Sequence, residues 1–421
     1  MYFSRLQSTT SMRKKLLTLV LFYPLLVLGQ SNNAPSSYDP HDIKITGYLQ
    51  TQFQQAQAAG ISSFSGGDFA ENSDNRFIIR RGRLKIDRVD NYSSVVFQLD
   101  ATQNGIQLMD AFIQLNHPEH KQLRLTAGLF NRPFGYAIVY SSGYRDFPER
   151  PRVFQTQMPR ERDIGAMISY QPLNRFKFLT ADFALVNGSG LFARDYDAKK
   201  DMIGSLSFKF DSLANRKLHI GFGGSFYKGS VRSDTERYYS EDRTGFTANT
   251  SPANKGANFK RNYFGGNIQL QYDNTFGITS LKAEYITGRQ PGIAASPAVR
   301  GPLASQSFST QPATDLYLRK FSGYYIWLSQ QILDTKFSAL AAYDVYDPNS
   351  ALSEKQIGLA NNTTAADIKF STLGYGFTYL FSTRVKLTIY NERVVNSPTL
   401  LADYQEDIRD DVFTARLQYR W

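Results

Sequence analysis

The chain has 421 residues, a formal net charge of +11, no cysteine and 14% aromatic residues, and its mean hydropathy is −0.38. The lack of cysteine excludes disulfide stapling and thiolate chemistry. A basic balance of this size favours anionic partners such as solutes, lipid or polysaccharide.

The N-terminal segment has the pattern of an export signal. Basic residues at 13–15 precede an apolar run over 16–28. This run is shorter than the roughly 20 residues of a membrane-spanning helix, so it predicts a cleaved signal peptide over residues 1–29, with Met12 as an alternative start. Removal of Arg5 and the three basic residues at 13–15 lowers the formal charge from +11 to +7. No cysteine follows the run, which excludes a lipoprotein-type signal.

After a polar lead-in at 30–42, apolar and polar residues alternate in segment after segment. No stretch here is apolar enough for a transmembrane helix, so the alternatives are a soluble exported protein and a β-barrel with lipid-facing and lumen-facing residues in alternation. Val95, Phe97 and Leu99, for example, share one face of a strand. Sixteen strands are predicted, at 43–55, 76–89, 92–103, 107–116, 121–130, 163–171, 175–187, 200–211, 216–229, 260–273, 276–288, 321–333, 335–346, 366–381, 383–395 and 410–421.

The connections between these segments alternate between short and long. Those after even-numbered segments are short, as at Asp90-Asn91 and Ser382, whereas those after odd-numbered segments are mostly long, with only 103–106 brief. Short periplasmic turns and long external loops are typical of outer-membrane barrels, and a soluble sandwich or propeller has no need of this asymmetry. The predicted fold is therefore an all-β, 16-stranded antiparallel up-and-down transmembrane barrel over residues 43–421, in the outer membrane of a Gram-negative bacterium.

The densest positive charge lies in the second predicted strand. Arg81, Arg83 and Lys85 alternate with apolar residues and are expected to climb the lumen wall at about 6.6 to 7 Å spacing. Such a ladder needs compensation by acids, water or passing anions. The alternative is a solvated lumen face whose charges pair with wall acids such as Asp100 and Asp110.

Two further arginines lie in predicted wall strands. Arg80 falls on the same predicted face as Leu84 and Ile86, which marks it as lipid-facing. It must therefore reach to an interface, or the strand register changes there. Arg124, in the fifth predicted strand, is a further candidate wall cation.

The connection at 131–162 is long, proline-rich and basic. A loop of this length is more often functional than idle, and by folding inward it would narrow the pore. Rings of arginine or lysine at a constriction select for anions, because guanidinium groups match carboxylate and phosphate in geometry. The alternative is an external loop held by its own pairs between arginines and the acids Asp146, Glu149 and Glu161. The candidate constriction residues are Arg132, Arg145, Arg150, Arg152, Arg160 and Arg162.

Several short motifs lie between residues 75 and 170. They are RRGRL at 80–84, DAF at 110–112, GLFNRPFG at 128–135, SS at 141–142, FPER at 147–150 and RDIG at 162–165. Together they resemble the N-terminal half of the phosphate-selective porin O and P family. The resemblance implies a sixteen-stranded outer-membrane barrel, usually trimeric, with an inward constriction loop and a basic ladder that guides anions. Because acids are interleaved in 131–162, a general porin or one for sugars or carboxylates remains an alternative to a phosphate pore.

Support for catalysis or metal binding is weak. The chain has four histidines, none beside a plausible serine nucleophile, and the His117-Pro118-Glu119-His120 stretch is interpreted as a solvated turn in preference to a metal site. No phosphate-binding glycine loop or nucleic-acid module occurs. We therefore expect no enzyme activity, cofactor, metal or nucleic-acid partner; the alternative is a barrel lipase with a site assembled from distant residues.

The last nine residues form an alternating strand that ends on an aromatic residue. It is expected to pair with the first strand around 43–53 and close the barrel, and it resembles the closing strand that such barrels present to their insertion machinery. The predicted lipid-facing residues are Phe413, Ala415, Leu417, Tyr419 and Trp421, and the predicted lumen-facing residues are Arg416, Gln418 and Arg420.

The sequence as a whole predicts a porin. It would be embedded in outer-membrane lipid, with two further copies beside it in a homotrimer as the resemblance implies. Small hydrophilic solutes would diffuse through it with a preference for anions, phosphate among them. The alternative is a non-conducting structural or assembly barrel whose loops bind partners or polysaccharide.

Overall fold

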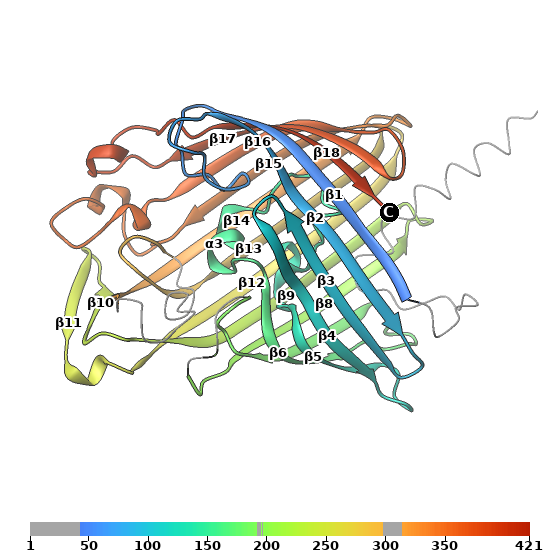
Figure 1. Ribbon diagram of the computed structural model, residues 1–421, viewed down its shortest axis with the longest axis horizontal. Coiled ribbons are helices and arrows are strands. Elements are labelled where there is room, and N and C mark those ends of the chain that lie inside the picture. Colours follow the sequence, from blue (N-terminus) through green and yellow to red (C-terminus); the bar gives the residue numbers. More distant parts are fainter. Residues whose placement is uncertain (1–42, 192–194, 196, 298–313) are drawn as a thin grey trace, which may run out of the picture.

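The computed structural model describes residues 43–191, 195, 197–297 and 314–421. The predicted signal peptide and lead-in lie outside the described residues. Within them, one sheet contains eighteen strands, of which β10 and β11 form an external hairpin and the other sixteen close into a barrel (Figure 1). The wall strands are β1 (Ile43–Ala56), β2 (Asn75–Val89), β3 (Ser93–Thr102), β4 (Gly105–Asn116), β5 (Leu123–Asn131), β6 (Arg162–Tyr170), β7 (Leu179–Val186), β8 (Asp201–Leu213), β9 (Leu218–Arg232), β12 (Asn258–Asn274), β13 (Gly277–Gly292), β14 (Leu316–Gln331), β15 (Phe337–Asp347), β16 (Phe370–Leu380), β17 (Val385–Asn396) and β18 (Val412–Arg420).

The barrel closes where the last strand returns to the first. β18 pairs antiparallel with β1 from Tyr48 opposite Arg420 to Ala56 opposite Val412. Beyond β18, the backbone of Trp421 donates to the carbonyl of Gly47 at 3.1 Å. The predicted pairing of the terminal strand with the first strand is therefore confirmed, and no strand edge of the wall is left open.

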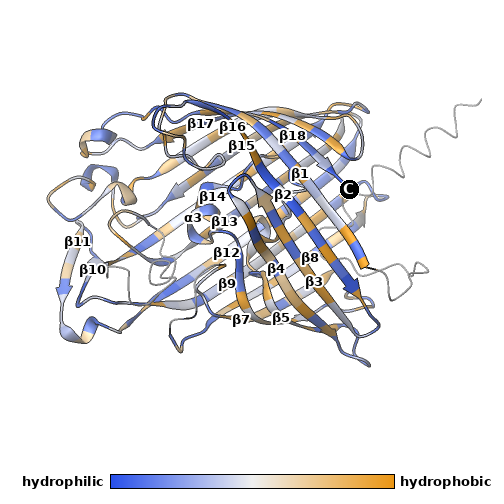
Figure 2. Ribbon diagram, in the orientation of Figure 1, coloured by the Kyte–Doolittle hydropathy of each residue, from blue (hydrophilic) through white to orange (hydrophobic). Residues whose placement is uncertain are grey.

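The two faces of the closing strand differ as the alternation predicts. Leu417 and Tyr419 are 47% and 45% exposed on the outside, whereas Arg416 and Gln418 are each only 4% exposed on the inside. Along the wall strands, hydrophobic and hydrophilic residues alternate in the same manner (Figure 2). This is the pattern of a wall with lipid outside and polar groups inside.

The connections keep the predicted asymmetry. One end of the barrel carries the short turns, such as 90–92 and 381–384, and the other carries long connections, such as 57–74 and 132–161. In the described part of the chain, every helix is too short or too polar to span a bilayer.

The external hairpin was not among the predicted elements. β10 (Arg237–Glu241) and β11 (Phe246–Thr250) pair within the connection between β9 and β12. β10 also runs parallel to the start of β14, where Tyr239 stacks on Tyr317 with ring centroids 4.3 Å apart. The segment is polar and rich in turn residues, and each strand has only five residues, so the alternation of side chains is too short to predict a hairpin.

A β-bulge explains the orientation of Arg80. Gln50 of β1 pairs with Arg81, but the next residue, Thr51, pairs with Ile79, so Arg80 is the extra residue of β2. One extra residue changes which face the following side chains occupy. Arg80 and Arg81 therefore both point into the lumen. Of the two explanations offered for Arg80, the change of strand register is confirmed and the reach to a membrane interface is not needed.

Candidate functional site: the inward segment and its charged wall

Residues 132–161, here called the inward segment, follow β5 and fold into the barrel. They contain two short helices, α2 (Gly135–Val139) and α3 (Arg152–Gln157). Figure 1 shows α3 inside the outline of the barrel. The predicted inward loop is therefore present, and the wall strands determine where it lies.

The start of the segment is bound to β13. The backbone N–H groups of Tyr136 and Ala137 donate to the carboxylate of Glu284 at 3.0 and 2.9 Å. Gly135 makes this approach possible: its φ is 62°, and a Cβ atom there would lie 1.8 Å from Glu284 Oε1. Only glycine fits this position, because it combines a left-handed backbone with no side chain.

One side of the segment packs against the barrel through aromatic rings. Phe147 stacks on Trp327 with centroids 4.9 Å apart, and Phe154 meets the edge of Tyr325 at 6.0 Å. Phe154 is fully buried. Burial of a phenylalanine side chain stabilises by about 1.5 to 3 kcal/mol, so these contacts fix the segment against β14.

Polar contacts join the inward segment to the wall opposite β13 and β14, namely to β1 and β18. The hydroxyl groups of Tyr48 and Ser142 lie 2.6 Å apart, and the Gln50 side chain donates to the Ser142 carbonyl at 3.1 Å. Gln418 donates to the carbonyl of Gly143 at 3.0 Å. The segment thus contacts β1 and β18 as well as β13 and β14, and crosses the lumen between them.

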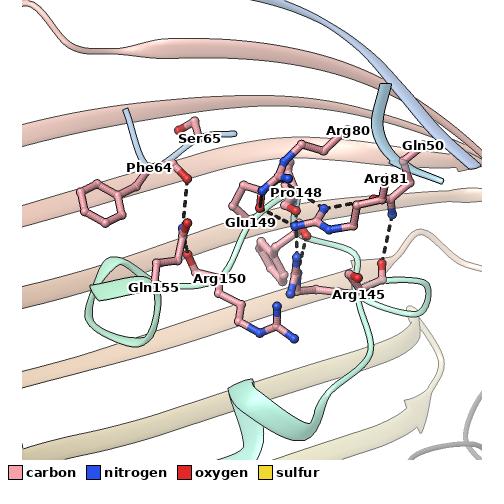
Figure 3. Close-up of polar contacts among 12 residues, drawn as sticks. Gln50, Phe64, Ser65, Arg80, Arg81, Arg145, Pro148, Glu149, Arg150 and Gln155 are labelled. Atoms are coloured by element: carbon pink, nitrogen blue, oxygen red, sulfur yellow. Dashed lines mark hydrogen bonds and ion pairs between the residues drawn. The ribbon is translucent and has the colours of Figure 1, made fainter. Parts of the chain in front are cut away.

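A single carboxylate at this crossing binds three guanidinium groups. Glu149 accepts from Arg80 at 2.8 Å and from Arg81 at 2.7 Å (Figure 3). It also accepts from Arg416 at 2.7 Å. Its side chain is only 3% exposed. Burial alone would raise the pKa of Glu149, but Arg80, Arg81 and Arg416 hold that pKa well below the usual carboxyl range. Glu149 therefore stays ionised at every physiological pH.

Arg145 adds a further positive charge at the same place. Its Nε and Nη2 donate to the carbonyls of Phe147 and Pro148, each at 3.0 Å, whereas its buried Nη1 has no hydrogen-bond partner. Burial, together with the charges of Arg150 and Arg81, lowers the pKa of Arg145 well below its usual value. An arginine nevertheless remains protonated in proteins. We call Arg80, Arg81, Arg145 and Arg416 the arginine cluster. The four positive charges of the cluster face the single negative charge of Glu149, which leaves an excess of three positive charges.

A second charged group is balanced. Glu161 binds Arg150 and, at 2.8 Å, Arg162, which in turn binds Asp110 at 2.8 Å. Burial would raise the pKa of Glu161, but Arg150 and Arg162 lower it to about 2. Two arginines face two carboxylates here, so this group orders the return of the segment to β6 without leaving spare charge.

The remaining predicted site residues are dispersed along the wall and in other parts of the inward segment. Arg83 pairs with Asp100 at 3.1 Å, Lys85 with Asp87 at 3.7 Å and Arg132 with Asp163 at 2.7 Å. The suggested pairing of the ladder with wall acids thus occurs for Arg83 with Asp100, whereas Asp110 binds Arg162 of β6 instead of a ladder residue.

Three other candidates have different surroundings. Arg160 is exposed and donates to Gln107. Arg124 lies near the start of β5, away from the inward segment, with buried Nε and Nη1 atoms that have no hydrogen-bond partner. Arg152 stacks on Phe370, its guanidinium carbon 3.6 Å from the ring centroid.

The meeting of Glu149 and Arg416 was not predicted from the sequence. Arg416 was assigned to the lumen face but not to the site, because it lies far along the chain from the inward segment. Closure of the barrel puts β18 beside β1, where Gln52 accepts from Arg416 Nε at 2.8 Å. The sequence signal that could have placed Arg416 in the site is its position as an arginine on the inward face of the closing strand.

The histidine stretch forms a turn, as predicted. Nδ1 of His117 accepts the backbone N–H groups of Glu119 and His120 at 3.2 and 3.0 Å. In the described part of the chain, no group of three or more His, Cys, Asp or Glu residues is arranged to hold a metal ion.

The sequence profile of the family described as phosphate-selective porin O and P matches residues 53–421. The chain belongs to this family. The match extends well past the motifs at 80–165 and includes the strands that close the barrel. No curated protein sequence matches the chain.

Solved porin structures share this family member's fold at low sequence identity. OprB of Pseudomonas putida has a TM-score of 0.58 and 9% identity over 90% of this chain and 94% of its own. The DcaP channel of Acinetobacter baumannii has a TM-score of 0.54 and 11% identity over 90% and 97%. An anion-selective porin from Comamonas acidovorans has a TM-score of 0.54 and 11% identity over 90% and 99%. The porin O and P family member is thus an outer-membrane barrel of the sixteen-stranded porin type.

Proposed function

We propose that the protein is a porin through which small hydrophilic solutes diffuse passively, with a preference for anions. The observation that carries the proposal is the arginine cluster, where four guanidinium groups surround one carboxylate at the level of the inward segment. Positive charge near a narrow part of a pore lowers the barrier for an anion and raises it for a cation. Within a Debye length of about 8 to 10 Å this field acts on solutes that the arginines do not touch.

The candidate wall residues contribute differently to this field. Arg83, Arg132, Arg150 and Arg162 are neutralised by their acids, so we assign them to holding the segment. Lys85 is 32% exposed and 3.7 Å from Asp87, which leaves it accessible to a passing anion. Arg124, with unpartnered guanidinium atoms, extends the positive wall toward the short turns.

Bilayer recordings test the proposal. In asymmetric KCl, the reversal potential should have the sign of anion preference, and Lys85→Glu should shift it toward zero. Lys355→Glu, on the exposed η3 turn (Glu354–Gln356), is the matched control and should leave it unchanged. Preference for cations would refute the anion assignment, and absence of any conductance would refute the porin.

One observation favours a second candidate, a structural barrel that does not conduct. The largest buried apolar cluster lies inside the barrel and joins Phe134, Phe147 and Phe154 of the inward segment to wall residues such as Trp327 and Tyr390. This packing occupies part of the lumen. The same recordings separate the two candidates, because a structural barrel gives no single-channel steps.

Further aspects of the proposal come from the family. Phosphate is the solute class its name carries, and a homotrimer in the outer membrane of a Gram-negative bacterium is its usual assembly. The closing strand β18 and the terminal Trp421 that follows it are what we propose the insertion machinery recognises. Competition of phosphate with chloride in the bilayer, and the mass of the detergent-solubilised protein, test the solute and the trimer.

A further inference from the structure

Four cationic side chains form a row on the outer face of the wall, at the external ends of β9, β12, β13 and β14. The strand register places Asn262 of β12 opposite both Lys228 and Arg289. Arg289 is in turn opposite Lys320. The fourth cation, Lys260, lies two residues from Asn262 toward the external end of β12. We call these four exposed residues the cationic row: Lys228, Lys260, Arg289 and Lys320.

The cationic row faces outward, at the edge of the apolar band of the barrel. Each of its members lies two or four residues from an exposed aromatic ring of the same strand, which puts ring and cation on one face. The pairings of these strands contain no register shift that would exchange the faces. Exposed rings mark the membrane interface of such barrels, so the row is at the level of the external lipid headgroups. The rings are those of Phe226, Phe264, Tyr285 and Tyr324, which are 37% to 63% exposed.

The protein compensates the charges of the cationic row only in part. Arg289 and Lys320 are directly opposite each other, where like charges repel. In the described part of the chain, no member of the row forms an ion pair. Two acids are nearby: Glu241 accepts from the backbone N–H of Lys320 at 2.9 Å, and Asp347 lies on the next strand, opposite Ser322. Four positive charges against two negative charges leave an excess of two.

The opposite side of the barrel differs at the same level. The outward residues near the external ends of β2, β4 and β7 include Phe77, Ile106 and Leu185, all of them exposed and apolar. An apolar rim needs only lipid chains beside it. The cationic row needs anions at the headgroup level, because neighbouring like charges without a partner are unfavourable.

We propose that the cationic row binds the phosphate groups of a phosphorylated lipid in the external leaflet. One phosphate group lies between Arg289 and Lys320, and a second lies between Lys228 and Lys260. Adjacent strands are about 4.8 Å apart, so the row extends across about 14 Å of wall, which gives room for two phosphate groups of one headgroup. Guanidinium and ammonium groups form charge-assisted hydrogen bonds with phosphate oxygens. The acyl chains pack along the exposed rings toward the middle of the membrane.

Native mass spectrometry measures the binding, because the mass of the complex identifies the lipid and its number. The folded protein in detergent is titrated with diphosphoryl lipid A and, separately, with monophosphoryl lipid A. The diphosphoryl lipid should bind with an apparent Kd at least about tenfold lower, since its second phosphate group adds charge-assisted hydrogen bonds. Inorganic pyrophosphate at the same concentration should not displace the lipid, because it lacks the acyl chains that pack on the rings.

Substitutions test whether the cationic row is the site. Arg289→Gln combined with Lys320→Gln should weaken binding of the diphosphoryl lipid at least about tenfold. Arg393→Gln is the matched control, because Arg393 is also exposed on the outer face, on β17 opposite Leu373. This control should bind the lipid as the native protein does.

Three outcomes overturn the inference. They are equal affinity for the two lipids, displacement of the lipid by pyrophosphate, and a loss of binding in Arg393→Gln as large as in the double variant. The titration of the native protein decides even if a variant fails to fold. The row lies outside the lumen, so lipid binding without conductance would refute the porin and support this site, whereas conductance without a preference for the diphosphoryl lipid would do the reverse.

Discussion

The two sides of the inward segment are held by different forces. Toward β13 and β14 it packs through buried rings such as Phe154 and through the Glu284 contact with α2. Toward β1, β2 and β18 it is held by the ion pairs of Glu149 with arginines of β2 and β18. The packing toward β13 and β14 adds no positive charge, whereas the unequal ion cluster leaves positive charge that acts on solutes. We therefore expect changes on the apolar side to alter pore size and changes on the charged side to alter selectivity.

The largest effect is expected from Glu149→Gln. Removing the charge of a buried ion pair costs roughly 3 to 5 kcal/mol, because the arginines that remain lose their partner. The excess positive charge at the cluster rises from three to four, so the anion preference should increase while the segment becomes easier to displace. Reversal potential and protease sensitivity of the segment measure the two effects. A weaker anion preference would show that the cluster does not act on the solute path.

Gly135→Ala tests the apolar side. The new methyl group would meet Glu284 Oε1 at 1.8 Å, and the φ of 62° is unfavourable for alanine. The cost of such strain and overpacking is roughly 2 to 3 kcal/mol. We expect α2 to move away from β13 and the single-channel conductance to rise, with little change in selectivity.

Gly67→Ala is the matched control for this variant. Gly67 has a φ of 107°, but a Cβ atom there has nothing within 4 Å. Its conductance should equal that of the native channel. If both variants change conductance alike, backbone strain and not the contact with Glu284 is the cause.

Acid should loosen the balanced group around Glu161. Its pKa of about 2 in the folded protein lies below the ordinary value of 4.5. A lowered pKa contributes stability that is complete above the ordinary value and is lost as the pH falls from 4.5 toward about 2. Conductance recorded across this range should become noisier as the pH falls, and Glu161→Gln should remove that dependence. The same pH dependence in Glu161→Gln would assign it to another group.

The smallest effect is expected from Arg160→Gln. Arg160 is exposed, so its substitution should change the free energy of unfolding by less than about 0.5 kcal/mol and leave the reversal potential as in the native channel. If the reversal potential shifts as much as in an arginine-cluster variant, the exposed end of the inward segment near Arg160 also contributes to selectivity.

The wall was predictable because each strand carries its own signal. Period-two alternation identified the sixteen wall strands, and the lengths of the connections gave the up-and-down order. At Arg80 the alternation was misleading, because a single extra residue in β2 exchanges the two faces and only the pairing with β1 reveals it.

The site was less predictable because it depends on contacts between distant parts of the chain. The sequence indicated which arginines and acids are present in 131–162, and the pairs of Glu161 with Arg150 and Arg162 were among its alternatives. It did not indicate the partners of Glu149 on the wall. Glu149 meets Arg416 only after the barrel has closed. The imbalance of the arginine cluster and the balance around Glu161 both follow from such pairings, and local patterns do not encode them.

The excess charge of the arginine cluster is the feature to which we attribute the preference for anions. The reversal potential of the native channel and of Arg145→Gln in asymmetric KCl tests this most directly, because Arg145 has no carboxylate partner among its hydrogen bonds. We expect an anion-preferring native channel and a shift toward cations in Arg145→Gln. Equal reversal potentials in the two channels, or a native channel that prefers cations, would contradict the attribution.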